Sequence, residues 1–109
     1  MSQTATTAWE SLRTADSRKV EAVLRKEFPH CDAYQYNSAA IRVRVIDARF
    51  KGKSVEQRDA MVEPLLQKLP DRIVAQILNL LTIYPGESNK SLSVRLANLE
   101  FEEPTPSLL

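Results

Sequence analysis

The sequence alternates apolar and basic residues over residues 41–46, where Arg42 and Arg44 separate isoleucine and valine side chains. Successive side chains of a β-strand point to opposite faces, whereas a helix would spread this pattern around its axis. The run is also rich in β-branched residues, which favour strands. It therefore predicts a strand with one apolar face on a core and one basic face that is either solvated or covered by a partner.

A glycine turn and an amphipathic helix follow this strand. Gly52, one of only 2 glycines in the chain, allows a sharp turn before Ser54. Ser54 and Gln57 have the spacing of a capping box, in which each side chain bonds to the backbone of the other residue. Apolar residues then recur at helical spacing, and Pro64 predicts a kink or a break near residues 59–63.

The other segments predict a small α+β domain with the element order αββααβ. A right-handed crossover makes the central strand parallel to the strand at residues 77–84. We expect three strands in a mixed sheet, a fourth strand if residues 97–102 join it, and helices packed on one face. Asp16 or Ser17 caps the first helix. The expected elements are a helix ending near residue 28, a strand at 33–37, a helix at 70–76, a strand at 77–84, a helix at 88–94 and a strand at 97–102.

Three regions follow from this pattern. Residues 1–12 are expected to be a mobile N-terminal segment in which Trp9 serves as a packing anchor. Residues 13–102 form one domain, and residues 103–109, which contain two prolines and no periodicity, form a tail.

The hairpin loop leaves the facing of Tyr34 and Tyr36 open, because the chain has no Asn-Gly turn signal here. Residues directly opposite each other on paired strands share a face. An odd loop, residues 38–40, would place Tyr36 opposite Arg42. Tyr34 would then lie opposite Arg44, whereas an even loop would place both tyrosines in the core.

The composition is that of an ordinary folded domain. The chain has 109 residues, of which 43% are hydrophobic and 27% charged, and its formal net charge is +1. This net charge does not by itself favour a nucleic-acid partner. A single cysteine cannot form an internal disulfide, and the sequence shows neither a signal peptide nor an apolar run of about 20 residues. We therefore expect a cytoplasmic protein with no membrane contact.

The stretch from Val45 to Ser54, followed by Arg58, resembles the BolA family. In that family a strand leads through a Phe-x-Gly-Lys/x-Ser turn into a helix that carries Arg-His, and residues 50–54 here read Phe-Lys-Gly-Lys-Ser. The resemblance covers residues 17–84. It implies the BolA-like fold, a relative of the type II KH arrangement, and suggests a bacterial sister group that lacks the family's cluster-ligand histidine.

The resemblance also implies which functional residues are missing. BolA proteins bind glutaredoxins and share an iron–sulfur cluster through a histidine that opens the last strand in a His-Ala-Leu segment. The corresponding segment here begins with Gln76, and glutamine is a poor ligand for such iron. Residues 38–40, where the second ligand of the family lies, contain neither His nor Cys, and Asp59 replaces the histidine of the helix. We expect no cofactor and no metal, with an iron–sulfur or glutaredoxin-linked role as a further alternative.

The densest charge asymmetry lies over residues 41–53, with five basic residues and one acidic residue. These residues could contact nucleic-acid phosphates, although we favour an ordinary solvated face. Residues 52–54 are similar to the end of a P-loop, but Asp47 stands where that motif needs its first glycine. The candidate binding surface comprises Arg42, Arg44, Arg49, Lys51, Gly52, Lys53 and Arg58.

No set of residues predicts catalysis or a small-molecule substrate. His30 and Cys31 are adjacent and point in opposite directions in an extended chain, so they make a poor chelating pair. A partly buried thiol and a surface imidazole is the favoured interpretation. The leading hypothesis is a non-enzymatic adaptor that binds a protein partner or self-associates, and a nucleic-acid-binding module is the alternative.

Overall fold

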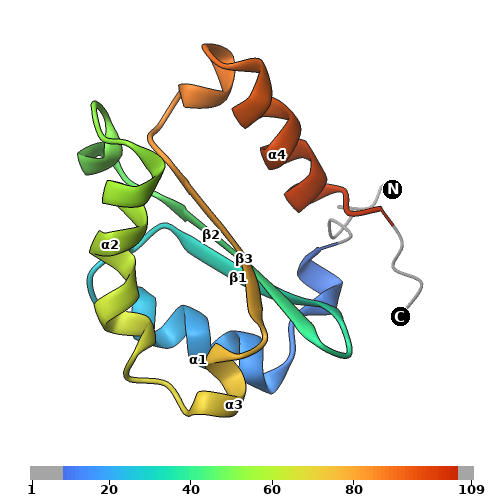
Figure 1. Cartoon of the computed structure of the whole chain (residues 1–109). Helices are drawn as coiled ribbons and strands as arrows, with labels where there is room; N and C mark the ends of the chain where they lie inside the picture. The colour runs from blue at the N-terminus through green and yellow to red at the C-terminus, as the bar shows by residue number, and fades with distance from the viewer. Residues whose placement is uncertain (1–8, 106–109) are drawn as a thin grey trace.

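A three-stranded sheet lies between two layers of helices (Figure 1). The structure is a computed structural model, and it describes residues 9–105. β2 lies in the centre of the sheet, antiparallel to β1 and parallel to β3. The elements in chain order are η1 (Glu10–Leu12), α1 (Ala15–Leu24), β1 (Cys31–Asn37), β2 (Ala40–Ile46), η2 (Ala48–Phe50), α2 (Val55–Leu66), α3 (Asp71–Val74), β3 (Ile77–Ile83), η3 (Glu87–Asn89) and α4 (Leu92–Glu102).

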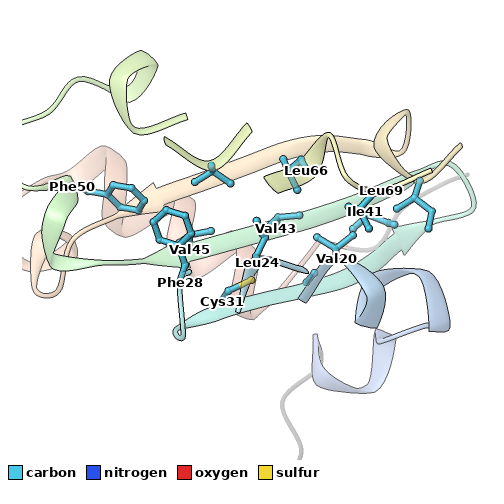
Figure 2. Packing of buried hydrophobic residues seen from close by; sticks show 13 residues of the cluster. Val20, Leu24, Phe28, Cys31, Ile41, Val43, Val45, Phe50, Leu66 and Leu69 are labelled. Atoms are coloured by element: carbon cyan, nitrogen blue, oxygen red, sulfur yellow. The ribbon is translucent and has the colours of Figure 1, made fainter. Parts of the chain in front are cut away.

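The predicted α+β fold with a mixed three-stranded sheet is confirmed. α1, α2 and α3 pack on one face of the sheet, as expected for the predicted helical layer. The main core lies between this layer and the apolar side of β2, where Ile41, Val43 and Val45 are fully buried (Figure 2). α4 adds a second layer on the opposite face, against Arg42 and Arg44.

The predicted strand at residues 97–102 is wrong, because these residues belong to α4. The segment alternates polar and apolar residues, but Asn98, Phe101 and Glu102 also have the spacing of one helix face. Their contacts with the sheet favour the helix over an added strand. The side chain of Ser91 accepts a hydrogen bond from the Val94 N–H and starts this helix.

The helix boundaries follow capping chemistry. Ser54 and Gln57 form the predicted capping box of α2. α1 is capped by Thr14 rather than by Asp16 or Ser17, because the Thr14 hydroxyl accepts the Ser17 N–H while the Ser17 side chain accepts the Thr14 N–H. α1 also ends earlier than predicted, at Leu24.

Of the kink or break predicted near residues 59–63, the break is wrong, because α2 continues through Pro64 to Leu66. Pro64 lacks the N–H that would bond to the carbonyl of the preceding turn, and it is exposed on the outer side of the helix. Val62 and Leu66, on the inner side, are buried in the main core. We infer that core packing holds the helix together across the missing hydrogen bond.

The hairpin places Tyr34 and Tyr36 on the face of the arginines. Tyr34 pairs with Arg42, and the register shifts between Gln35 and Asn37. The face agrees with the odd-loop alternative, but the pairing is displaced by two residues because that alternative placed Tyr34 opposite Arg44. The short turn alone would place the tyrosines on the core face. The bulge at Tyr36 shifts the register by one residue and returns them to the face of the arginines.

A second apolar cluster forms on the arginine face and includes Trp9. Trp9 and Phe101 are 7% and 2% exposed, and both rings contact the fully buried Tyr34. Trp9 is thus a packing anchor, as predicted, and η1, which follows it, contacts β1. Residues 1–8, the rest of the predicted N-terminal segment, and residues 106–109 of the tail lie outside the described residues.

Candidate functional site

Arg42 of the predicted basic surface lies under α4. Its guanidinium donates hydrogen bonds to the Tyr34 hydroxyl at 3.1 Å and to a Glu100 carboxylate oxygen at 3.2 Å. It also stacks on the Tyr36 ring at 3.7 Å from the ring centroid. Thr105 donates further hydrogen bonds to Glu100, and these hydrogen bonds with that of Arg42 hold the pKa of Glu100 below its usual value. Arg42 therefore holds α4 on the sheet.

Arg44 is more deeply covered, with only 6% of its surface exposed. Its guanidinium donates to Asp32 of β1 at 2.9 Å and to Asn98 and Glu102 of α4 at 2.8 and 2.9 Å. The ring of Phe101 lies 4.6 Å away, and the Nε atom has no hydrogen-bond partner. The expectation that the arginines face outward is wrong, because α4 covers them and supplies Glu100 and Glu102 as ion-pair partners.

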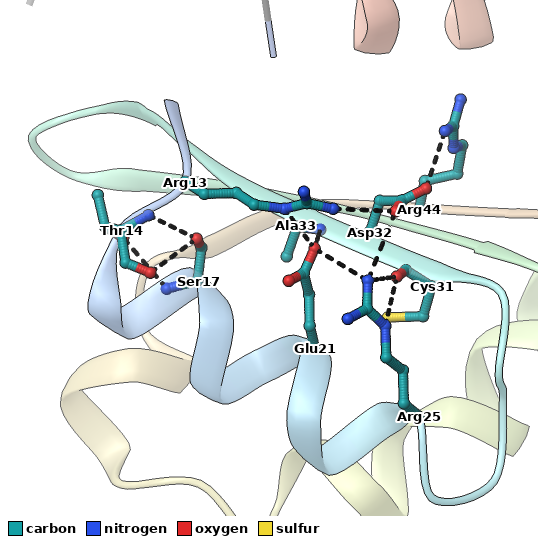
Figure 3. Close-up of polar contacts among 9 residues, drawn as sticks. All are labelled: Arg13, Thr14, Ser17, Glu21, Arg25, Cys31, Asp32, Ala33 and Arg44. Atoms are coloured by element: carbon teal, nitrogen blue, oxygen red, sulfur yellow. Dashed lines mark hydrogen bonds and ion pairs between the residues drawn. The ribbon is translucent and has the colours of Figure 1, made fainter. Parts of the chain in front are cut away.

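The carboxylate of Asp32 connects Arg44 to a polar network at the outer edge of β1 (Figure 3). Arg13 and Arg25 lie 3.3 and 3.7 Å from this carboxylate. Both arginines also pair with Glu21, which is 3% exposed and accepts the backbone N–H of Ala33 at 2.9 Å. Hydrogen bonds therefore satisfy this buried carboxylate, as its burial requires.

The turn at residues 49–53 is the exposed part of the predicted surface. Lys51, Gly52 and Lys53 are all exposed, and Gly52 has φ +81°, which accounts for a glycine at this position. Arg49 is exposed but paired, with its Nε 2.8 Å from an Asp47 oxygen. The hydrogen bond from Arg49 lowers the pKa of Asp47. The structure thus gathers only Arg49 and residues 51–53 into one exposed basic region.

Arg58 is separate from this region, since it is 7% exposed and bonded into the fold. Its guanidinium donates to the Lys53 carbonyl at 2.9 Å, to the Thr82 carbonyl at 3.0 Å and to Glu87 at 2.7 Å. It therefore ties the start of α2 to β3 and to η3. Its predicted place on the open binding surface is wrong.

Gln76, at the position that the resemblance assigns to a cluster ligand, is paired with another side-chain amide. The Gln35 side chain donates to the Gln76 side chain at 2.9 Å, and Ser38 lies in the same open depression. His30 is exposed and Cys31 is 1% exposed, and burial raises the pKa of the Cys31 thiol to about 12. Within residues 9–105, no group of three or more His, Cys, Asp or Glu side chains is arranged to hold a metal ion.

A groove between α2 and β3 was not found by sequence reasoning. Its volume is about 260 Å³, and it carries two carboxylates, Asp59 and Glu63, above an apolar floor. Burial raises the pKa of Asp59, and the charge of the nearby Glu63 adds to this effect. The lining residues are Asp59, Glu63, Leu66, Gln67, Val74, Ile77, Leu78, Asn79 and Leu80. No periodicity in the sequence predicts this groove, since it depends on how α2 packs beside the last strand.

The outer face of α4 carries three exposed leucines, here called the leucine stripe: Leu92, Leu96 and Leu99. They are 63%, 56% and 50% exposed, and their spacing places them on one side of the helix. The i, i+4, i+7 spacing was visible in the sequence. The stripe was missed because residues 97–102 were predicted to form a strand, whereas they belong to α4.

The sheet order, the parallel β2–β3 pair and the α1–α3 layer define an α+β protein with a BolA-like fold. Solved structures of two BolA1 proteins are among those that share it. BolA1 from Arabidopsis thaliana matches with a TM-score of 0.50 and 15% identity over 68% of this chain and 96% of that chain. BolA1 from Mus musculus matches with a TM-score of 0.53 and 18% identity over 86% of this chain and 82% of that chain. No protein-family model and no curated protein matches the sequence.

Proposed function

We propose that this protein is a non-enzymatic adaptor that binds another protein through the leucine stripe of α4. The observation that carries the proposal is the exposure of Leu92, Leu96 and Leu99, each of which is at least half exposed. Large apolar side chains that are exposed together mark interaction surfaces more often than isolated ones do. An apolar i, i+4, i+7 set is also the pattern that helices present to the apolar groove of a partner.

α4 is well suited to present such a surface, because its inner face is fixed to the sheet. Phe101 is buried, and Asn98 and Glu102 bond to Arg44. Side chains on a rigid element lose less conformational freedom on binding than side chains on a loop. The stripe is therefore held in place before a partner arrives.

The nucleic-acid alternative has weaker support than the protein-binding function. Arg42 and Arg44 are paired with Glu100, Glu102 and Asp32, which leaves the turn with Lys51 and Lys53 as the basic contact region. A cluster or glutaredoxin-linked role has weaker support still, because Gln76 bonds to Gln35 where the resemblance expects a ligand.

The proposal is tested by comparing wild type with Leu96→Gln in affinity capture from a cell extract, with quantitative mass spectrometry of the retained proteins. We expect wild type to enrich a defined partner and Leu96→Gln to lose at least about tenfold of it, since one buried leucine contributes roughly 1.5–3 kcal/mol. Val55→Gln is the matched control, because Val55 is 61% exposed but lies on α2. Equal enrichment by wild type and Leu96→Gln would contradict the proposal.

Light scattering of the purified protein separates a foreign partner from self-association. A monomer is expected at micromolar concentration. A dimer that Leu96→Gln dissociates would identify a second copy as the partner of the stripe.

A further inference from the structure

The two edges of the sheet are protected to different degrees. At the β1 edge, the Ala33 N–H donates to Glu21 at 2.9 Å and the Cys31 carbonyl accepts from Arg25 at 2.8 Å. Side chains thus occupy backbone groups that an added strand would use. β3 forms the other edge, since the sheet order ends there.

On the β3 edge, among the described residues, a side chain bonds to the backbone only near the C-terminal end of the strand. The Thr82 carbonyl accepts a hydrogen bond from Arg58 at 3.0 Å, so the Thr82 backbone faces away from β2. Alternation along a strand places the Leu80 N–H and carbonyl on the same outer edge. Within residues 9–105, no side chain bonds to the backbone of residues 78–80, and Leu78 is 70% exposed.

The register reinforces this opening. β3 pairs Ile77 with Ile41 and Asn79 with Arg42, so Leu78 is an extra residue with no counterpart in β2. Leu78 and Asn79 are both exposed. The start of β3 is therefore a short segment of strand with backbone groups and an apolar side chain open to a ligand.

The groove beside this segment determines which ligand is compatible with it. Leu66, Val74 and Leu80 provide apolar contacts, while Asp59 and Glu63 lie one helical turn apart on α2 and also line the groove. No lysine or arginine lines it. Both carboxylates lack an ion-pair partner in the described part of the chain, so a cationic side chain would complement the groove.

We propose that residues 78–80 of β3 bind, as an added strand, an extended peptide in which a basic and an apolar residue stand two positions apart, so that both side chains face the groove. An apolar side chain of the peptide enters the groove, and a lysine or arginine pairs with Asp59 and Glu63. A second copy of β3 is a poor occupant, because it would bring its own Asp59 and Glu63 toward the same acidic wall. This site is separate from the leucine stripe, so it does not depend on the proposed function of α4.

The experiment titrates ¹⁵N-labelled full-length protein with the synthetic peptide Lys-Ser-Val-Ser-Lys-Ser-Val, acetylated and amidated at its ends, in which the lysines and valines share one face of the strand. We expect amide shifts at residues 77–81 and on the groove side of α2. The same peptide with glutamate in place of both lysines is expected to bind at least tenfold more weakly. Two N-methylated peptides are compared, one methylated at the odd-numbered residues and one at the even-numbered residues. One of them should lose binding and the other should keep it, because only alternate N–H groups face β3.

Glu63→Lys tests the charge pairing, and Glu103→Lys is its matched control, because both residues are exposed and the change in charge is equal. We expect Glu63→Lys to weaken the affinity for the lysine-containing peptide at least tenfold and Glu103→Lys to leave it within twofold. Spectra of both variants verify that they are folded. Equal affinity for both peptides, shifts confined to another surface, no binding at millimolar peptide, or dimerisation through the β3 amides would each overturn the proposal.

Discussion

Arg44 is the residue on which the second helical layer most depends. It is a buried cation between Asp32 and Glu102, and it also contacts the Phe101 ring. Removing one partner of a buried ion pair leaves the other charges without compensation, whereas a surface pair contributes little. The alternating arginines are thus part of the interior of the molecule.

Arg44→Met is expected to lower the free energy of unfolding by about 3 kcal/mol, because Asp32 and Glu102 lose their shared cation. Urea denaturation followed by circular dichroism measures this change. Arg95→Met is the control, since Arg95 is exposed on α4, and we expect a change within about 0.5 kcal/mol. Equal stability of Arg44→Met and wild type would show that the pairs contribute nothing net.

Cys31 is expected to react slowly with thiol reagents at pH 8, because burial raises its pKa to about 12 and the thiolate is the reactive form. In the unfolded chain the thiol returns to the ordinary cysteine pKa of 9.0. The folded state therefore holds this proton more tightly, and its contribution to stability is complete below pH 9 and is lost as the pH rises toward 12.

The Cys31 prediction is checked by the rate of reaction with a disulfide reagent in native and urea-unfolded protein, and by urea midpoints from pH 8 to 11. Cys31→Ala should reduce the loss of stability at high pH. It should not remove the loss completely, because burial also raises the pKa of Tyr34. Rapid labelling of the native protein at pH 8 would be inconsistent with a buried thiol.

At the scale of elements, α2 stays helical through Pro64 because its inner face packs in the main core, although proline disfavours a helix interior. Pro64→Ala is expected to raise the free energy of unfolding by about 1–2 kcal/mol, because alanine restores the N–H that can bond to the carbonyl of Ala60. Pro64 is exposed, so the change removes little core packing. Thermal and urea unfolding measure it, and Pro70→Ala is the comparison, since Pro70 precedes α3 and should not stabilise the chain in this way.

Elements with local signals were predictable from the sequence. The alternation in β2 and the Ser54–Gln57 capping box identified the central strand and the helix after it. α4 was missed in part because residues 97–102 satisfy both a strand period and a helix period. The contacts that choose between them, such as Asn98 with Arg44, join residues far apart in the chain.

In the candidate site too, features made by residues close in sequence were predictable, and features made by residues far apart were not. The exposed glycine turn was found because Gly52 and the basic residues around it are neighbours in sequence. The covering of Arg42 and Arg44 could not be found, because Glu100 and Glu102, which pair with them, lie on α4, far away in the sequence. The groove beside β3 likewise results from the packing of separate elements.

At the scale of the whole molecule, two apolar clusters lie on opposite faces of one sheet. Phe101→Ala should cost about 3–4 kcal/mol, because Phe101 is 2% exposed and its removal leaves a cavity beside Tyr34. We expect the amides of α4 to exchange much faster with deuterium while those of β2 remain protected, since the main core is untouched. Equally faster exchange in β2 would show that the two layers unfold as one unit.

None of the helices in residues 9–105 is long and apolar enough to cross a bilayer. Among the described residues, the large apolar side chains that are exposed include the leucine stripe and Leu78.

The cluster of Trp9, Tyr34 and Phe101 has a consequence for synthesis on the ribosome. Tyr34 and the two arginines beside it emerge long before the aromatic ring and the carboxylates that will cover them. Until the last helix has left the exit tunnel, a nascent chain would display a bare, cationic β-surface. A chain stalled before α4 would keep that surface exposed.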